Sequence, residues 1–384
     1  MRILLINYEY PPVGAGAATA TKAMGRALSA SGHNVTVLTT RYGRFLSEVE
    51  EGGVNVIRVD SRRRRAESAS ILEMVSFMMH ALWVVRRLVR TEKIEGVIEF
   101  FSIPCGPVAL WAHWATKVPY IVSLRGGDVP GAEPGLGVVH RLLTPIRRAV
   151  MRSARAVVAN SSGLKLLAEK ADPFPVSVIA NGVDSSFFVP LPSPKCHDDV
   201  KLLFVGRFQK QKNLLWLLEQ FESIAKGSHV RVSLDMVGDG PQKSEVIEQI
   251  ATLGLSESVF LHGWLGRSQL RDYYQNANLV LNPSLYEGMP NVVLEAMSCG
   301  CAVLASRVPG NDAVVQDGVT GWLFDLNDSE GFQKRISDVI SNPQLARDAG
   351  SAGRLRVEHE FSWSHAAQSY LELLGDSTPI SSHQ

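Results

Sequence analysis

The residues with the clearest capacity for chemistry are two glutamates, Glu287 and Glu295, in the segment NPSLYEGMPNVVLEAMSCG that begins at Asn282. A short apolar run precedes this segment and an apolar helical pattern follows Pro290, so the order strand, loop, helix is predicted. The two carboxylates are eight residues apart, a little over two helical turns, and can therefore face one cleft. Such carboxylates can bind sugar hydroxyls. Taken alone, two solvated glutamates on a surface helix are the simpler interpretation.

The expected start of this helix predicts an anion site beside the carboxylates. Pro290 suits a first helical turn, because a helix start leaves that N–H group unpaired in any case. The amides of Asn291, Val292 and Val293 would then point free N–H groups toward the loop, where a helix end carries partial positive charge.

Two cations, Arg207 and Lys212, are candidates for binding a diphosphate. Arg207 ends a predicted strand and Lys212 follows five residues later, so both can reach one diphosphate. Arginine binds by a planar fork and lysine as a point charge. For an arginine and a lysine in an ordinary loop, two surface cations would be the simpler explanation.

A glycine-rich loop, PPVGAGAATAT, follows the first predicted strand. Gly14 and Gly16 would let the backbone approach a phosphate closely, and the following helix start would add free N–H groups. Thr19 stands where the third glycine of the dinucleotide-binding fingerprint would be, which disfavours a nicotinamide enzyme. A plain tight turn is the alternative explanation of this loop.

Polar residues also follow two later strands, predicted at residues 97–101 and 120–124. They include Glu99, Arg125 and Asp128. Ligands of open parallel sheets lie beyond the carboxyl ends of the strands, so these side chains are candidates for a binding cleft.

These residues are expected to be positioned by two α/β domains, because 384 residues are too many for one ordinary core. The first domain is predicted over residues 1–189, with six or seven strands. A proline-rich linker at 190–200 precedes the second domain at 201–360, a helix at 361–375 that packs back on the first domain, and a tail at 376–384. Strands and helices alternate, with strands expected at residues 3–6, 35–39, 54–59, 97–101, 120–124, 156–159, 176–179, 202–205, 230–237, 259–261, 279–281 and 302–305.

Composition excludes extensive disorder, since 45% of residues are hydrophobic and 20% are charged. The net charge of +1 conceals an asymmetry: residues 1–195 hold 24 basic and 15 acidic residues, and residues 196–384 hold 15 and 23. Four consecutive arginines, residues 62–65, precede an apolar helix at about 71–88 that ends in further arginines. This pattern can bind an anionic membrane surface, or the helix can simply cover the sheet.

The four cysteines have neither the density of a disulfide framework nor a metal-binding spacing, and Cys299 and Cys301 are expected to be small buried residues. The apolar run at the N-terminus is too short for a signal peptide. A reducing, cytoplasmic location is therefore expected, with peripheral binding to the inner face of a membrane as an option.

Taken together, the motifs of the chain resemble the nucleotide-sugar glycosyltransferases of family 4, the glycosyl transferases group 1. The resemblance spans nearly the whole chain in the order GAGA, GH, NGVDSSFF, GRFQKQKN, GDGP, HGW, EGMPNVVLEA and DGVTGWLF. It implies an α/β fold of GT-B type, with two doubly wound Rossmann-like parallel-sheet domains facing an interdomain cleft. It also implies hexosyltransferase activity with retention of anomeric configuration, with no metal and no cofactor.

The resemblance further implies roles for individual residues. Glu287 would contact the donor sugar and stabilise its cationic transition state, with Arg207 and Lys212 as the other catalytic residues, and Glu295 would hold the ribose hydroxyls. The other donor-binding residues implied are Gly14, Gly16, Arg125, Gly238, His262, Gly263, Trp264, Gly288, Met289, Pro290, Asn291, Val292 and Val293. The acceptor-side candidates are Tyr8, Glu9, Glu99, Asp128 and the loop at residues 62–65.

Two positions depart from the family pattern. Arg125 stands where many members have a histidine near the donor sugar; it can clamp an anionic group or pair with Asp128. Ala313 stands where a glutamate is frequent.

The favoured function is transfer of a sugar from a UDP- or GDP-sugar to a glycan, lipid-linked or small-molecule acceptor, as in the synthesis of cell-envelope polysaccharide or lipopolysaccharide. No nucleic-acid partner is expected. A sugar-nucleotide epimerase of the same fold and a non-catalytic glycan-binding protein are the alternatives.

Overall fold

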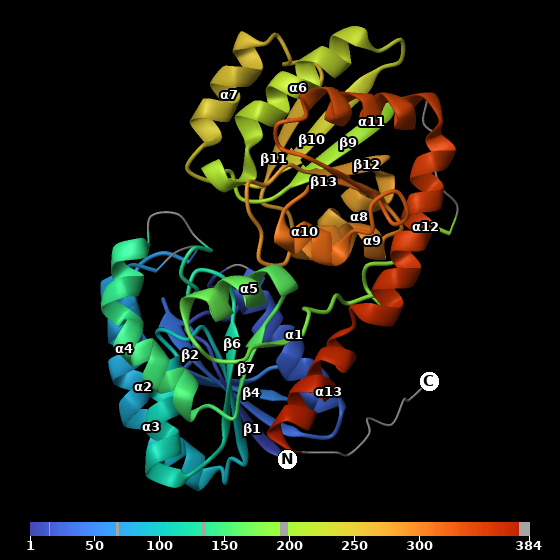
Figure 1. Ribbon diagram of the computed structural model, residues 1–384. Helices are drawn as coiled ribbons and strands as arrows, with labels where there is room; N and C mark the ends of the chain where they lie inside the picture. The colour runs from blue at the N-terminus through green and yellow to red at the C-terminus, as the bar shows by residue number, and fades with distance from the viewer. Residues whose placement is uncertain (15, 67–68, 133–135, 193–198, 376–384) are drawn as a thin grey trace. The chain divides into compact units, whose positions relative to one another are not determined.

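The computed structural model describes residues 1–14, 16–66, 69–132, 136–192 and 199–375 (Figure 1). The chain forms two compact units. Unit 1 comprises Met1–Gly182 together with the chain from Trp363, and unit 2 comprises Val183–Ser362.

Unit 1 is built on an eight-stranded sheet in the order β3-β4-β2-β1-β5-β6-β7-β8. All neighbouring strands are parallel except β3, which runs antiparallel to β4. Our expectation of six or seven strands missed β3, because three residues are too few to show an alternating pattern. The strands are β1 (Arg2–Ile6), β2 (Asn34–Tyr42), β3 (Glu48–Glu50), β4 (Val54–Arg63), β5 (Gly96–Phe100), β6 (Tyr120–Leu124), β7 (Ala156–Ala159) and β8 (Ser177–Val178).

Helices cover both faces of this sheet. Strand β1 shows the alternation: Ile3 and Leu5 pack with α1 (Gly16–Ala30) and α13 (Trp363–Leu374), whereas Leu4 and Ile6 pack on the opposite face. That opposite face is covered by α2 (Ile71–Thr91), α3 (Gly106–Thr116), α4 (Gly137–Ser153) and α5 (Ser162–Ala171). Figure 1 shows α2, α3 and α4 on one side of the sheet and α1 and α13 on the other.

Unit 2 has a six-stranded parallel sheet in the order β11-β10-β9-β12-β13-β14. Its strands are β9 (Val200–Val205), β10 (Val232–Val237), β11 (Val259–Gly263), β12 (Leu279–Asn282), β13 (Ala302–Ser306) and β14 (Trp322–Phe324). Its helices are η1 (Lys210–Lys212), α6 (Leu214–Gly227), α7 (Lys243–Thr252), α8 (Arg267–Asn276), α9 (Asn291–Ser298), α10 (Pro309–Val314), α11 (Ser329–Ser341) and α12 (Pro343–Glu360). Apart from the antiparallel β3, both sheets have the parallel α/β organisation that the alternating pattern predicted.

The boundary between the units, at Gly182 and Val183, lies before the proline-rich segment in which we expected it. The segment after the boundary belongs to unit 2 because Phe188 is buried there, with its ring centroid 6.0 Å from that of Tyr274. The Ser298 hydroxyl and the Arg354 guanidinium both donate to the Phe188 carbonyl, each at 2.7 Å. Residues 193–198 of the expected linker and the expected tail at 376–384 lie outside the described residues.

Cys105, Cys299 and Cys301 are buried free thiols, and Cys196 lies outside the described residues. Among the helices that the structure describes, none combines the length and the apolar character needed to cross a bilayer.

Candidate active site

Three loops of unit 2 meet because the strands before them are neighbours. Strand β12 pairs with β9 on one side and with β13 on the other, all in parallel. The loop after β9 carries Arg207 and Lys212, the loop after β12 carries Glu287, and α10 follows β13. All three therefore leave the carboxyl edge of one sheet, where parallel α/β proteins bind their ligands.

Lys212 and Glu287 form an ion pair at the centre of these loops. The Lys212 Nζ lies 2.5 Å from Glu287 Oε1, and their side chains are only 13% and 8% exposed. The same carboxylate oxygen lies 2.7 Å from the Ser284 hydroxyl. An ammonium group has three N–H donors, so Lys212 can hold Glu287 and also bind an anionic oxygen. The pair therefore places a cation and a carboxylate at one point of the sheet edge.

Gln211 holds the two loops in this arrangement. Its side-chain amide donates to the Tyr286 carbonyl at 2.7 Å, and its own carbonyl accepts the Leu285 N–H at 2.8 Å. The Gln209 side chain donates in turn to the Gln211 side chain at 2.7 Å. The loop that carries Lys212 and the loop that carries Glu287 are thus joined by hydrogen bonds to backbone groups as well as by the ion pair.

A buried polar network lies directly behind Glu287, and our sequence reasoning missed it. The Ser284 hydroxyl lies 2.7 Å from Asn282 Oδ1, and the Asn282 amide donates to Asn311 Oδ1 at 3.0 Å. The Asn311 amide donates to the Ser306 carbonyl at 2.8 Å, and the Ser306 hydroxyl donates to the Ser284 carbonyl at 2.5 Å. Because these side chains are buried, their mutual hydrogen bonds are needed to offset desolvation. The available signal was a polar residue at the end of each buried strand, Asn282 and Ser306.

Gly310 in α10 packs against the backbone of Glu287. A Cβ atom at position 310 would lie 2.7 Å from the Glu287 carbonyl oxygen, closer than real Cβ contacts come. Glycine at 310 therefore allows α10 to approach the loop that carries Glu287. Ala313, which stands where the family frequently has glutamate, belongs to the same helix.

Gly206, Gly238 and Gly263 bring the turns after β9, β10 and β11 together. A Cβ atom on Gly238 would overlap the Gly206 carbonyl oxygen, and the Gly238 N–H donates to the Gly263 carbonyl at 2.8 Å. Arg207 follows Gly206 directly and is half-buried. Among the described residues, none forms an ion pair with the Arg207 guanidinium. This cation is therefore available to an anionic ligand.

His262 is held in one orientation by two neighbours in unit 2. Its Nε2 lies 2.5 Å from Asp235 Oδ1, and its Nδ1 lies 3.0 Å from the Tyr273 hydroxyl. Burial, and after it the Asp235 charge, raises the pKa of Tyr273. Trp264, two residues further on, is 61% exposed. An exposed indole beside a fixed imidazole can stack against a planar ring.

Glu295 lies on α9 and accepts a hydrogen bond from the Tyr274 hydroxyl at 3.0 Å. Burial raises its pKa to about 7, although the Tyr274 hydrogen bond and Arg267 act in the opposite direction. Glu287 and Glu295 thus contact different partners, Lys212 in one case and Tyr274 in the other.

The start of α9 differs from our expectation. The helix begins at Asn291 and Pro290 is its N-cap, with a ψ of 96°. The Val293 N–H donates to the Pro290 carbonyl at 3.0 Å, so the prediction that the Val293 amide is free was wrong. The physical reason is that an extended Pro290 places its own carbonyl where it accepts the N–H three residues later.

In unit 1, Asp128 binds backbone groups. One carboxylate oxygen accepts the N–H of Arg125 at 2.9 Å and that of Gly126 at 3.1 Å, and the other accepts the N–H of Ser102 at 2.7 Å. Its carboxylate therefore orders the turn after β6 and links it to the turn after β5.

Glu99 is completely buried, and neither of its carboxyl oxygens has a hydrogen-bond partner among the described residues. Burial, and after it the charge of Asp128, raises the pKa of Glu99 well above its usual range. In this structure its carboxyl group does not reach the surface, where an acceptor would contact it.

Arg125 stacks on Phe100, with its guanidinium carbon 4.1 Å from the ring centroid, and donates to Asn181 Oδ1 at 2.6 Å. We had expected Arg125 either to clamp an anionic group or to pair with Asp128 through its side chain. The structure does not show the side-chain pair; instead, the Asp128 carboxylate accepts the backbone N–H of Arg125. Burial lowers the pKa of Arg125.

Part of the expected arginine loop is buried. Strand β4 extends to Arg63, whose guanidinium donates to the Tyr8 carbonyl at 3.4 Å and lies 3.9 Å from the Glu9 carboxylate. The expectation of a surface loop was therefore wrong for Arg63, because this side chain supports Tyr8 and Glu9.

Gly14 of the glycine-rich loop packs against Glu9: a Cβ atom at position 14 would lie 2.5 Å from the Glu9 carboxylate. Gly16 begins α1, and residue 15 lies outside the described residues.

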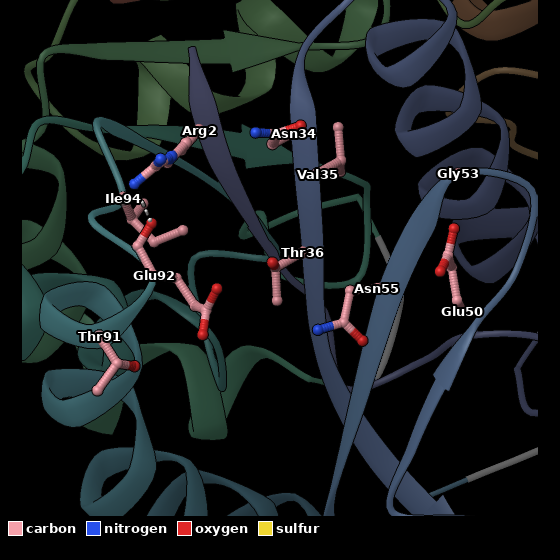
Figure 2. A pocket seen from close by; sticks show the side chains of 10 residues that line it. All are labelled: Arg2, Asn34, Val35, Thr36, Glu50, Gly53, Asn55, Thr91, Glu92 and Ile94. Atoms are coloured by element: carbon pink, nitrogen blue, oxygen red, sulfur yellow. Dashed lines mark hydrogen bonds between the residues drawn. The ribbon is translucent and has the colours of Figure 1, made fainter.

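A hollow of about 350 Å³ lies elsewhere in unit 1, at the amino ends of β1, β2 and β4 (Figure 2). Its lining includes Arg2, Asn34, Thr36, Asn55 and Glu92. This is the edge opposite to the one that carries Tyr8, Glu99 and Asp128, so the hollow is separate from the candidate residues.

Comparison with known proteins agrees with this fold. The model of the family "Glycosyl transferases group 1" matches residues 192–356, and that of the "Glycosyl transferase 4-like domain" matches residues 15–182. Alpha-maltose-1-phosphate synthase of Mycolicibacterium smegmatis is 28% identical over 97% of this chain and 98% of its own length. UDP-Gal:alpha-D-GlcNAc-diphosphoundecaprenol alpha-1,3-galactosyltransferase of Escherichia coli is 32% identical over 45% of this chain and 47% of its own.

Among solved structures, HepE of Anabaena in complex with UDP-glucose has a TM-score of 0.77 at 19% identity, and the match covers 98% of this chain and 99% of HepE. With two parallel α/β units of GT-B type and a family model matched to each of them, this chain belongs to the group 1 glycosyltransferases, with a glycosyl transferase 4-like domain in its first half.

Proposed function

We propose that this glycosyltransferase moves a sugar from a nucleoside diphosphate sugar to a hydroxyl of its acceptor, with retention of anomeric configuration and without a metal. The observation that carries the proposal is the ion pair of Lys212 and Glu287 at the carboxyl edge of the unit 2 sheet, beside Arg207, which forms no ion pair with a described residue.

In the proposed reaction the bond between the anomeric carbon and the diphosphate oxygen breaks, and a bond from the same carbon to the acceptor oxygen forms. The acceptor proton passes to the leaving phosphate oxygen, and the nucleoside diphosphate departs. Lys212 and Arg207 stabilise the charge that develops on the diphosphate, as preorganised cations do without reorganisation cost. They would thereby supply the stabilisation for which other transferases use a divalent cation.

Glu287 acts by its charge in this proposal. Its Oε1 already accepts the Lys212 ammonium and lies beside the Ser284 hydroxyl, which lowers the nucleophilicity of that oxygen. A negative charge held in this way stabilises an oxocarbenium-like centre without forming a covalent intermediate.

We assign the other parts of the donor to the remaining residues of unit 2. Glu295 would accept the ribose hydroxyls, and Gly263 with Trp264 would bind the base beside His262. A uridine nucleotide is the favoured donor, since HepE is solved with UDP-glucose and the galactosyltransferase relative is named for UDP-Gal.

The proposed acceptor is a glycan or lipid-linked glycan of the cell envelope, used at the inner surface of a membrane to which the protein binds peripherally. Support comes from the excess of basic residues in the first half of the chain and from the relative named for a diphosphoundecaprenol acceptor.

The test begins with thermal shift of the protein against a panel of sugar nucleotides, in buffer with and without EDTA. The donor that binds is then incubated with candidate acceptors, and the product anomer is identified by proton NMR. Retention in the presence of EDTA supports the proposal. An inverted product, or a requirement for added metal, contradicts it; donor epimerised without acceptor would instead indicate an epimerase.

A further inference from the structure

The outer surface of α2 in unit 1 carries a stripe of exposed apolar side chains. Leu72, Val75, Met79 and Trp83 follow one another at spacings of three or four residues, so they lie on one side of the helix. Leu72 is 81% exposed and Trp83 is 84% exposed. The other side of α2 packs in the core through residues such as Phe77. The stripe is therefore additional to the face that folds the protein.

Helices α3 and α4, which cover the same face of the sheet as α2, extend this surface. Trp111 and Trp114 are exposed on α3, and Val138, Leu142 and Ile146 are exposed on α4. Helix α3 contacts both α2 and α4, and Figure 1 shows the three helices on the same side of the sheet. We call these exposed apolar residues of α2, α3 and α4 the apolar face of unit 1. It includes three of the seven tryptophans of the chain.

The charges around this face are nearly all positive. Within the bounds of α2, α3 and α4 the sequence has one acidic residue, Glu73, and it is used in the N-cap of α2 with Ser70. The exposed cations near the face are Arg86, Arg87, Arg90, Arg141 and Arg152, and none of them forms an ion pair with a described residue. Arg147 and Arg148 of α4 differ, because both pair with Asp172. The cations near the face therefore remain available for an anionic partner.

On α2, the cations continue the apolar stripe at the same helical spacing. Continuing the stripe from Trp83 by three and then four residues leads to Arg86 and Arg90. Arg90 also donates to the Ala115 carbonyl at 3.5 Å, so its guanidinium contacts the helix that carries Trp114. Apolar side chains and cations thus share one surface, as in helices that lie in a membrane interface.

We propose that the apolar face of unit 1 is the surface by which the protein docks on a bilayer containing anionic phospholipid. Leu72, Trp83 and Leu142 insert at the boundary of headgroups and acyl chains, with the indole rings at headgroup level. The surrounding arginines contact lipid phosphates. This inference deepens the proposed membrane location and rests on that part of the proposed function.

Charge complementarity favours a bilayer over a protein groove. An acidic protein partner would match the arginines, but exposed tryptophans and leucines spread over three helices match a broad interface between water and hydrocarbon. Each arginine that contacts the anionic surface should contribute about 1 kcal/mol to binding. This corresponds to roughly a fivefold increase in the partition coefficient.

The experiment is co-sedimentation of the full chain with vesicles of phosphatidylcholine alone and with added phosphatidylglycerol, at low and high salt. Wild type should bind only the anionic vesicles, and less at high salt. Arg86→Gln with Arg90→Gln should lower the partition coefficient by roughly 30-fold, from two cations at about 1 kcal/mol each. Trp83→Ser with Leu142→Ser should lower it by at least tenfold, since each removes apolar area that docking on the bilayer would bury.

Matched controls lie in unit 2. Lys334→Gln on α11 removes an exposed cation and Leu355→Ser on α12 removes an exposed apolar side chain, and both should bind vesicles as wild type does. Thermal unfolding checks that every variant is folded, and thermal shift with the sugar nucleotide checks the donor site separately.

The docking surface is rejected if folded wild type fails to bind anionic vesicles at low salt, or if the variants bind as wild type does. It is also rejected if light scattering shows that wild type self-associates and the Trp83 variant does not, because the face would then join two copies. Normal donor binding in either case would leave the proposed transfer reaction standing.

Discussion

Lys212 and Glu287 are 75 residues apart in the chain, yet the ammonium nitrogen of one lies 2.5 Å from a carboxylate oxygen of the other. Both groups are largely shielded from water, so their mutual orientation is set by the protein. A cation held by a carboxylate has lost part of its solvation before any ligand arrives. This preorganisation gives the pair its proposed role in stabilising a departing diphosphate.

Removing the Lys212 charge should slow turnover more than it weakens donor binding. The negative charge on the diphosphate is larger in the transition state than in the ground state, so Lys212→Ala should lower kcat by about 10²-fold to 10³-fold while the donor Kd changes little. Steady-state kinetics at saturating acceptor, with calorimetric titration of the donor, measures both quantities. Arg207→Ala should behave in the same way.

Lys210 provides the matched control for this comparison, because it lies in the same short helix and forms no ion pair with a described residue. Lys210→Ala should retain nearly wild-type kcat. Equal activity in the Lys212, Arg207 and Lys210 variants would contradict the assignment of the donor site.

Ser284 should act as a positioning residue for Glu287. Ser284→Ala removes the hydroxyl that lies 2.7 Å from both Glu287 Oε1 and Asn282 Oδ1. Loss of this buried hydrogen bond should cost about 1–3 kcal/mol of unfolding free energy and lower kcat, with the donor KM nearly unchanged. Denaturant unfolding and kinetics measure the two effects.

A merely structural role for Ser284 predicts a different result. In that case the unfolding free energy falls while kcat, measured well below the unfolding temperature, remains that of wild type. Ser337→Ala, on the exposed side of α11, is the control and should change neither quantity.

Glu295 should make the protein less stable as pH rises toward neutrality. Its pKa is raised to about 7 in the folded state, so between pH 4.5 and 7 the folded state holds a proton that the unfolded state has lost. The favourable contribution is complete below the unfolded pKa and declines as pH rises to about 7, by up to about 3 kcal/mol. Melting temperatures from pH 5 to 8 measure the decline.

Glu295→Gln should flatten that pH profile, because the amide cannot titrate, and should weaken donor binding if Glu295 holds the ribose. Glu99→Gln is the comparison in unit 1: its buried carboxyl also has a raised pKa, but its replacement should leave donor binding unchanged. A Glu295→Gln profile identical to that of wild type would rule out titration of Glu295 as the cause.

Gly310→Ala should displace the loop that carries Glu287. The new Cβ atom would lie 2.7 Å from the Glu287 carbonyl oxygen, so α10 and the loop must separate, at a cost of about 1–3 kcal/mol. We expect lower stability together with lower kcat. Gly227→Ala at the end of α6 meets open space and should have neither effect. Unchanged kinetics in Gly310→Ala would show that the loop tolerates this displacement.

The order of strands and helices was largely predictable from the sequence. Apolar runs such as residues 120–124 and 156–159 match β6 and β7, and the pattern at 363–374 matches α13. These segments are long enough, or apolar enough, for their periodicity to be read locally. Short elements such as β3 were not predicted, because they contain too few residues to show a periodic pattern.

The sequence by itself determined the family and the identity of the residues placed at strand ends, including Arg207, Lys212 and Glu287. Only the tertiary structure decided which of them meet. Strand β9 lies beside β12, a pairing between segments far apart in the chain, and this pairing brings Lys212 to Glu287. The pairing of β12 with β13 likewise brings Asn282 to Asn311. Burial likewise distinguished Arg63 and Glu99 from the exposed charges around them. The physical reason is that strand order and burial depend on how the whole core packs, and no local pattern of residues contains that information.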